Sequence, residues 1–98
     1  MAKYTFSQKA INDLNSIWKY TVETRSEKQA DNYYDIIVSQ IDEISKNPQL
    51  GRSYESVDEN LLGLKVQKHN IFYQIKENTI EVIRILHAQM DLKNRLKK

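Results

Sequence analysis

The positions of the chain-breaking residues constrain this 98-residue sequence more than any other feature. It contains two glycines and one proline, and all three lie between positions 48 and 63. Because glycine and proline most often interrupt helices and strands, residues 1–47 can form long, unbroken elements. The sequence therefore predicts a helical first half, then a loop from Pro48 to about residue 60, and strands after it.

Two amphipathic helices are predicted in the first half, over about residues 8–24 and 27–46. In each of them apolar side chains recur three or four residues apart, which is the period of one helix face. Ser7 and Ser26 precede them, and serine oxygens accept the unpaired backbone N–H groups at helix starts. Pro48 cannot continue the second helix, because it lacks a backbone N–H. The short link predicts an antiparallel hairpin whose apolar faces share one surface.

Alternation of apolar and polar residues predicts four strands, over about residues 2–6, 61–68, 70–76 and 79–87. Glu77 and Asn78 separate the last two strands, which predicts a hairpin. The order β-α-α-β-β-β, in one domain over residues 1–98, predicts an α+β fold. Its helical hairpin packs on one face of a small, mostly antiparallel sheet, and a basic tail with a short helix follows.

The last predicted strand is apolar on both faces. Strict alternation places on one face Ile80, Val82, Arg84 and Leu86, and on the other Ile83 and Ile85. A strand of this kind is usually covered on both sides, whereas two helices cover only one. We therefore expect the tail, residues 88–98, or a second polypeptide to cover the other face, with partial exposure to water as the alternative.

Composition excludes several classes of protein. The chain has no cysteine, which excludes disulfide scaffolds, thiolate metal sites and cysteine nucleophiles. Its net charge of +2 is too small to indicate a nucleic-acid-binding protein, so no sequence-specific nucleic-acid binding is expected. No apolar run approaches the ~20 residues of a membrane span, and the N-terminus lacks a signal-peptide core. A cytoplasmic protein without membrane contact is expected.

Few residues could support chemistry. The sequence has no phosphate-loop, zinc-protease or nucleophile-elbow motif. His69 and His87 do not have metal-ligand spacing, so neither a metal site nor a cofactor is expected. An RNA-cleaving centre needs a base, an acid and a cation, which His69, His87 and Arg84 could supply. The alternative, which the residue types alone favour, is that these side chains are surface charges and strand ends.

The end of the last predicted strand carries the most specific pattern. Residues 84–91 match R-I-L-H-x-x-M-D, which closely resembles the ParE branch of the RelE/ParE toxin superfamily. Further matches follow the order of that family: A-x-x-D-L at 10–14, Q-A-x-x-Y at 29–33, N-P-Q-L-G-R at 47–52, G-L at 63–64 and H-x-I-F-Y at 69–73. The resemblance covers about residues 4–92. Each piece is loose alone, but the ordered set is specific.

This resemblance implies the toxin of a type II toxin–antitoxin system, with the fold predicted above. ParE-like toxins poison DNA gyrase by binding it and catalyse no reaction, whereas RelE-like relatives cut messenger RNA on the ribosome. Residues 88–92 lack the aromatic and basic ending of many such nucleases, which favours the gyrase branch and a protein that is not an enzyme. A RelE-like endonuclease centred on His69, Arg84 and His87 is the alternative, and a non-toxic binding module is the third hypothesis.

The resemblance also implies a partner, a ParD-like antitoxin that forms a hetero-oligomer with the toxin. Its C-terminal segment is expected to be acidic, to fold on the toxin and to bury apolar sheet and hairpin surface. The residues predicted to face the antitoxin or the target are Arg84, His87, Met90, Asp91 and Arg95. For Asp91, capping of the short helix in the tail is the alternative.

Overall fold

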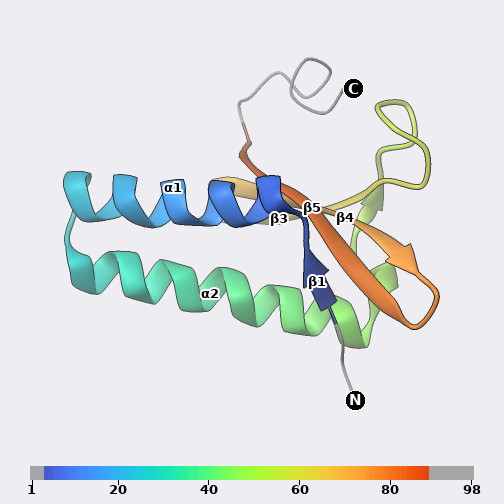
Figure 1. Ribbon diagram of the computed structural model, residues 1–98, viewed down its shortest axis with the longest axis horizontal. Helices are drawn as coiled ribbons and strands as arrows, with labels where there is room; N and C mark the ends of the chain where they lie inside the picture. The colour runs from blue at the N-terminus through green and yellow to red at the C-terminus, as the bar shows by residue number, and fades with distance from the viewer. Residues whose placement is uncertain (1–3, 89–98) are drawn as a thin grey trace.

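A helical hairpin lies on one face of a five-stranded sheet in the computed structural model, which describes residues 4–88 (Figure 1). The elements are β1 (Tyr4–Phe6), α1 (Gln8–Thr24), α2 (Glu27–Lys46), the 3-10 helix η1 (Pro48–Leu50), β2 (Arg52–Ser53), β3 (Leu62–Val66), β4 (His69–Lys76) and β5 (Thr79–His87). The predicted α+β class and the hairpin-on-sheet arrangement are confirmed. No helix within residues 4–88 has both the length and the apolar composition needed to cross a membrane.

The sheet brings the first and last strands together. Its strand order is β1-β5-β4-β3-β2, with β1 parallel to β5 and every other pair antiparallel. Ser7 then starts α1 beside β5: its side chain accepts the Ala10 backbone N–H at 3.0 Å and donates to the Ile83 carbonyl at 2.6 Å. Ser26 caps α2 in the same way through the N–H of Gln29, at 3.1 Å. Both serine caps agree with the sequence prediction.

The segment after α2 is more ordered than the predicted loop. It contains η1 and β2, and β2 is a fifth strand that pairs Arg52 with Gly63. A strand of two residues has no alternation to detect, so the sequence did not reveal it. The Tyr73 hydroxyl fixes this segment by donating to the Pro48 carbonyl at 2.6 Å and accepting the Gly51 N–H at 2.9 Å. A Cβ at Gly51 would lie 2.9 Å from Cε1 of Tyr73, so glycine permits this close approach.

The turn between β3 and β4 is wider than predicted. β3 ends at Val66 and β4 begins at His69, which leaves Gln67 and Lys68 as the turn. Gln67 has φ of 54°, in the left-handed region that two-residue hairpin turns require. The predicted strand over about 61–68 is therefore shorter in the structure.

Strand β5 contains a bulge that overturns the predicted division of its faces. Phe72 pairs with Arg84 but Tyr73 pairs with Val82, so Ile83 is an extra residue opposite β4. An extra residue reverses the alternation beyond it. Ile85 consequently joins the core beneath the helices, and Leu86 lies in the cluster on the other face. The prediction that Leu86 shares the face of Ile80 and Val82 is wrong for this reason.

On the other face of the sheet, residues of the loop provide part of the cover, which was not expected of them from the sequence. Leu61, Phe72 and Leu86 are buried there, and partly buried Tyr54 and Val57 pack against them. The ring of Tyr54 meets that of Phe72 edge to face, with centroids 5.1 Å apart. Residues 54–60, which were predicted only as a loop, therefore form part of this cover together with Leu61 at the start of the next predicted strand, and the tail lies outside the described residues.

Candidate functional site

A clasp between Asp13 and Arg84 joins α1 to β5. Nε of Arg84 donates to Oδ2 of Asp13 at 2.7 Å, and Nη2 donates to Oδ1 at 2.9 Å. Oδ2 also accepts the backbone N–H of Ile85 at 3.0 Å. The two side chains are only 16% and 15% exposed, and the bonds from Asp13 raise the pKa of the Arg84 guanidinium. The clasp therefore fixes α1 along the edge of β5.

Beside this clasp the two histidines of the chain face one another. His69 on β4 pairs with His87 on β5, and their rings lie 5.4 Å apart at 76°. The strand bulge determines this pairing: in the unshifted register His69 would oppose Leu86. The structure thus brings together two residues that are eighteen positions apart.

Tyr33 of α2 holds the ring of His69. Its hydroxyl lies 2.7 Å from Nδ1 of His69 and donates to the carbonyl of Val66 at 3.1 Å. The single proton of the hydroxyl is used in the bond to Val66. We therefore assign Nδ1 of His69 as the donor to the hydroxyl, which leaves a lone pair on Nε2. Burial raises the pKa of the Tyr33 hydroxyl, which therefore stays protonated.

Burial, together with the charges of His87 and Lys68, lowers the pKa of His69 to about 4 against the opposing effect of Asp13. The unfolded chain, with an ordinary histidine, binds more protons than the folded chain between this value and 6.5. We therefore expect the contribution of His69 to the free energy of unfolding to be complete above pH 6.5 and to be lost as the pH falls toward 4. An NMR titration should place the ring of His69 near 4. In urea unfolding at a series of pH values, the His69→Gln variant should lose less stability between pH 6.5 and 4 than the wild type does. A titration midpoint near 6.5 for His69 would contradict this prediction.

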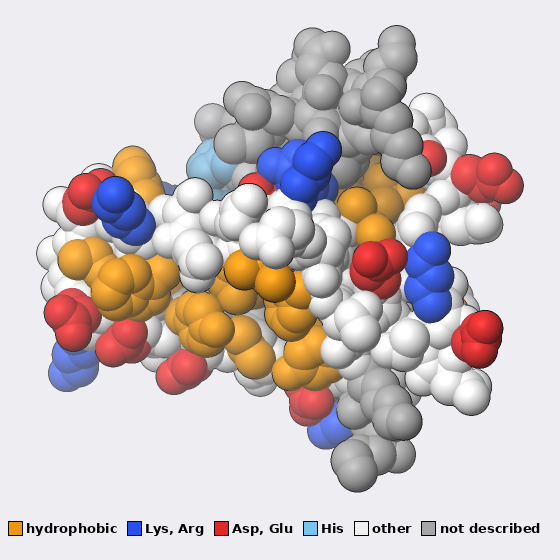
Figure 2. All heavy atoms as spheres, viewed as in Figure 1, with side chains coloured by type: hydrophobic (Ala, Val, Ile, Leu, Met, Phe, Trp, Pro, Cys, Tyr) orange, Lys and Arg blue, Asp and Glu red, His pale blue; other side chains and the backbone are white. Residues whose placement is uncertain are grey.

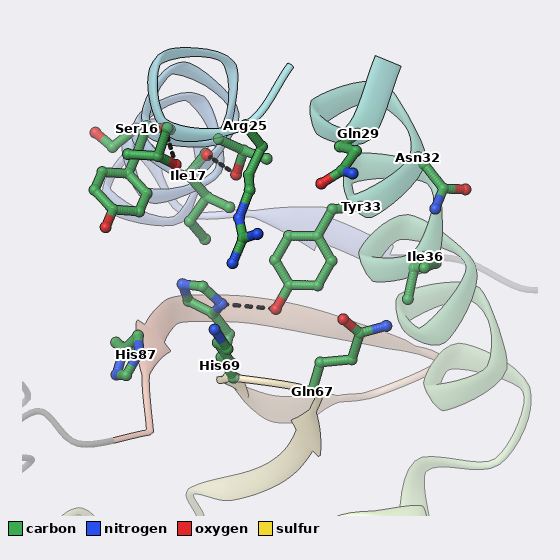
Figure 3. A pocket seen from close by; sticks show the side chains of 14 residues that line it. Ser16, Ile17, Arg25, Gln29, Asn32, Tyr33, Ile36, Gln67, His69 and His87 are labelled. Carbon is green, nitrogen blue, oxygen red and sulfur yellow. Dashed lines mark hydrogen bonds between the residues drawn. The ribbon is translucent and has the colours of Figure 1, made fainter. Parts of the chain in front are cut away.

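These side chains line a cavity of about 780 Å³ between the hairpin and the end of the sheet (Figure 3). The polar lining comes from α1, from the link between the helices, from α2 and from the β3–β4 turn; it includes Arg25, Gln29, Asn32, Gln67 and Lys68. Tyr20 of α1, which is 66% exposed, lies on the same cavity. Among the described lining residues there is no carboxylate. No three His, Asp or Glu side chains within residues 4–88 are grouped to hold a metal ion.

A second, shallower groove lies on the outer side of the hairpin. It is lined by Asn15, Trp18, Lys19, Asp31 and Tyr34, and we call it the outer hairpin groove. The indole N–H of Trp18 donates to Asp31 at 2.8 Å, which ties α1 to α2 across the groove. Figure 2 shows hydrophobic side chains in a band that follows the junction of the two helices.

Comparisons with known proteins identify the family. The family model for the ParE toxin of the type II toxin–antitoxin system parDE matches residues 4–92. The toxin ParE1 of Mycobacterium tuberculosis is 31% identical over 96 residues, 97% of this chain and 98% of that protein. The toxin ParE1 of Caulobacter vibrioides is 28% identical, over 98% of this chain and 99% of its own length. A solved structure of the chromosomal ParDE system from P. aeruginosa has the same fold, with a TM-score of 0.79 at 20% identity over 91% of this chain and 98% of that chain.

The chain belongs to the ParE toxin family. The resemblance inferred from the sequence motifs is confirmed, and the structure explains why these motifs occur together. Residues from different ParE motifs are joined in pairs by hydrogen bonds: Asp13 with Arg84, Tyr33 with His69, and Gly51 with Tyr73. In this chain, these six motif residues therefore hold the helices and the loop on the sheet.

The candidate site residues of this ParE-family toxin are only partly brought together. His69 and His87 line one cavity, whereas Arg84 does not line it and is bound by Asp13. Met90, Asp91 and Arg95 lie outside the described residues. The predicted contacts with antitoxin or target therefore stay predictions.

Sequence reasoning did not predict the partners of Asp13 and Tyr33, and it assigned no role in a site to Arg25. Asp13 and Tyr33 were visible as members of the A-x-x-D-L and Q-A-x-x-Y motifs, but their partners are 71 and 36 residues away. Arg25 lies outside every motif, and no signal in the sequence marked it.

Proposed function

We propose that this ParE-family toxin arrests DNA replication in the cytoplasm by binding DNA gyrase, without catalysing a reaction itself. The clasp of Arg84 with Asp13 carries this proposal. An RNA-cleaving centre on these strands would need Arg84 as the cation that stabilises the developing phosphorane charge. In the structure that guanidinium makes a two-bond contact with a carboxylate of the same chain, which suits a structural role.

One observation favours the alternative, a ribosome-dependent endonuclease. His69 and His87 lie side by side, and two imidazoles could act as base and acid in cleavage by a 2′-hydroxyl. The two functions predict different effects of removing both rings. A nuclease should lose several orders of magnitude in rate, whereas gyrase inhibition should weaken only in a graded way, because His87 is one predicted contact among several.

The test uses purified full-length protein and the His69→Gln/His87→Gln double variant. Supercoiling by gyrase is measured on relaxed plasmid, trapped cleaved DNA is measured after protein removal, and message cleavage is measured on programmed ribosomes. We expect both proteins to inhibit gyrase and neither to cut messages. Cleavage by the wild type that the double variant lacks would overturn the proposal, and so would normal growth after induction in cells without an antitoxin.

We further propose that a ParD-like antitoxin neutralises the toxin by placing an amphipathic helix in the outer hairpin groove. Tyr34 is 40% exposed and Ile11 is 41% exposed, and helical spacing puts Ile11 on the same face of α1 as Trp18. The edge strands of the sheet offer few backbone groups to which a strand of the antitoxin could pair, because β1 has three residues and β2 has two. A helix in a groove therefore suits this surface better than an added strand. The net charge of +2 favours an acidic partner.

The Tyr34→Ser variant should bind the antitoxin at least about tenfold more weakly, because exposed aromatic side chains in grooves often dominate binding energy. The Tyr20→Ser variant is the matched control, since Tyr20 is an exposed tyrosine of the same hairpin that lines the other cavity. Titration calorimetry with purified antitoxin measures both affinities. Equal affinities for the two variants would contradict docking in the outer hairpin groove.

A further inference from the structure

The cavity lined by Tyr33 and the two histidines has no role in the proposed function. Its volume of about 780 Å³ is within the range of small-molecule sites, roughly 300–1,000 Å³. It also combines cations, aromatic rings and amides at one place. We propose that this cavity binds a nucleotide, with the phosphate on its cations and the base among its rings and amides.

The electrostatics of the cavity favour an anion. Arg25 and Lys68 line it, and none of its described lining residues is an Asp or a Glu. Asp13 is close enough to influence His69, but both of its oxygens already accept bonds from Arg84. Figure 3 shows the guanidinium of Arg25 extending between the helices toward His69 and Tyr33. Its planar group of donors suits the oxygens of a phosphate.

The remaining lining groups suit a base rather than a bare ion. Tyr20 and His87 provide rings on which a base can stack, and such stacking is tolerant of base identity. The amides of Gln29, Asn32 and Gln67 each offer both donors and an acceptor for the polar edge of a base. The apolar side chains of Ile17 and Ile36 complete the lining.

Tyr33 and His69 form a fixed part of this site. The hydrogen bond from Nδ1 to the Tyr33 hydroxyl holds the imidazole ring, and in Figure 3 the second ring nitrogen points away from Tyr33. Because His69 is neutral near pH 7, that nitrogen is an acceptor. It can accept a hydrogen bond from a ribose hydroxyl or from an amino group of the base, and an inorganic anion has neither group.

The test is titration calorimetry of the full chain with AMP, adenosine, inorganic phosphate and a 5′-phosphorylated RNA pentamer. We expect AMP to bind with a Kd below about 1 mM, and adenosine and phosphate each to bind at least tenfold more weakly. NMR shifts on AMP addition should concentrate at His69 and His87. If the pentamer binds more tightly than AMP, the ligand of the cavity is the 5′ end of an RNA strand. If it binds equally, the ligand is a free nucleotide.

The variants Arg25→Gln and Lys68→Gln should each weaken the binding of AMP at least tenfold. Lys9→Gln is the matched control, because Lys9 is an exposed cation of α1 that does not line the cavity. Equal effects of all three variants, absence of AMP binding, or equal binding of a glutamate-rich hexapeptide would overturn the proposal. This inference is independent of the gyrase proposal, because Arg25→Gln should leave gyrase inhibition and antitoxin affinity unchanged.

Discussion

Replacing Asp13 with alanine should lower the free energy of unfolding by about 3 kcal/mol, as expected when one partner of a largely buried ion pair is removed. The guanidinium of Arg84 is 16% exposed and would lose two charge-assisted bonds. The N–H of Ile85 would lose its acceptor at the same time. Since α1 is fixed to the edge of β5 through these contacts, the loss should also loosen the start of the hairpin.

Urea unfolding at pH 7 measures this effect, and two variants make it interpretable. Asp42→Ala removes an exposed carboxylate whose partner Lys46 lies 3.2 Å away, and such a solvent-screened pair should contribute far less than the clasp. Asp13→Ala combined with Arg84→Met removes both charges of the clasp, and should recover part of the loss because no unpaired cation remains. Equal stability of Asp13→Ala and Asp42→Ala would show that the clasp does not hold α1.

The helices could be predicted from the sequence because their signals are local. Ser7 and Ser26 form the caps in the structure, and the predicted ranges of about 8–24 and 27–46 agree with α1 and α2. A cap and a 3.6-residue period need only neighbouring residues, so no tertiary information is required.

What the sequence could not provide is the extra residue of β5, and several errors follow from it. Neither Ile83 nor its neighbours Val82 and Arg84 is a glycine, the residue that most often marks a bulge in a sequence. The bulge changes which face Leu86 occupies and sets His69 opposite His87. The histidine pair, which lies at the centre of the candidate site, therefore depends on a register that hydrophobic alternation alone does not encode.

Contacts between segments that are distant in the sequence could not be predicted for a related reason. Asp13 and Arg84 are 71 residues apart, and their attraction becomes specific only when α1 lies along β5. The same is true of residues 54–61, whose cover of the sheet depends on Tyr54 and Val57 within a polar loop. Their apolar side chains are too few to produce a periodic pattern.

Replacing Phe72 with alanine should lower the free energy of unfolding by about 3–5 kcal/mol, the usual cost of truncating a fully buried phenylalanine. Phe72 has no exposed surface, and it packs against Tyr54 and Leu61 on the face away from the helices. Gly63 reflects the closeness of this packing, because a Cβ there would lie 2.7 Å from Tyr54 and 3.0 Å from Phe72. A cavity in so tight a layer should free residues 54–61 from the sheet.

Ile75→Ala is the matched control, since Ile75 is an apolar residue of the same strand that is 41% exposed. It should cost clearly less than Phe72→Ala, because 41% of Ile75 already meets water and the group removed is smaller. Hydrogen exchange of the isolated toxin should show faster exchange over residues 54–61 in Phe72→Ala than in Ile75→Ala. A loss of stability that appeared only in the complex with the antitoxin would mean that a partner, and not residues 54–61, buries this face. The expected loss in the isolated chain would instead leave the outer hairpin groove as the apolar surface available to the antitoxin.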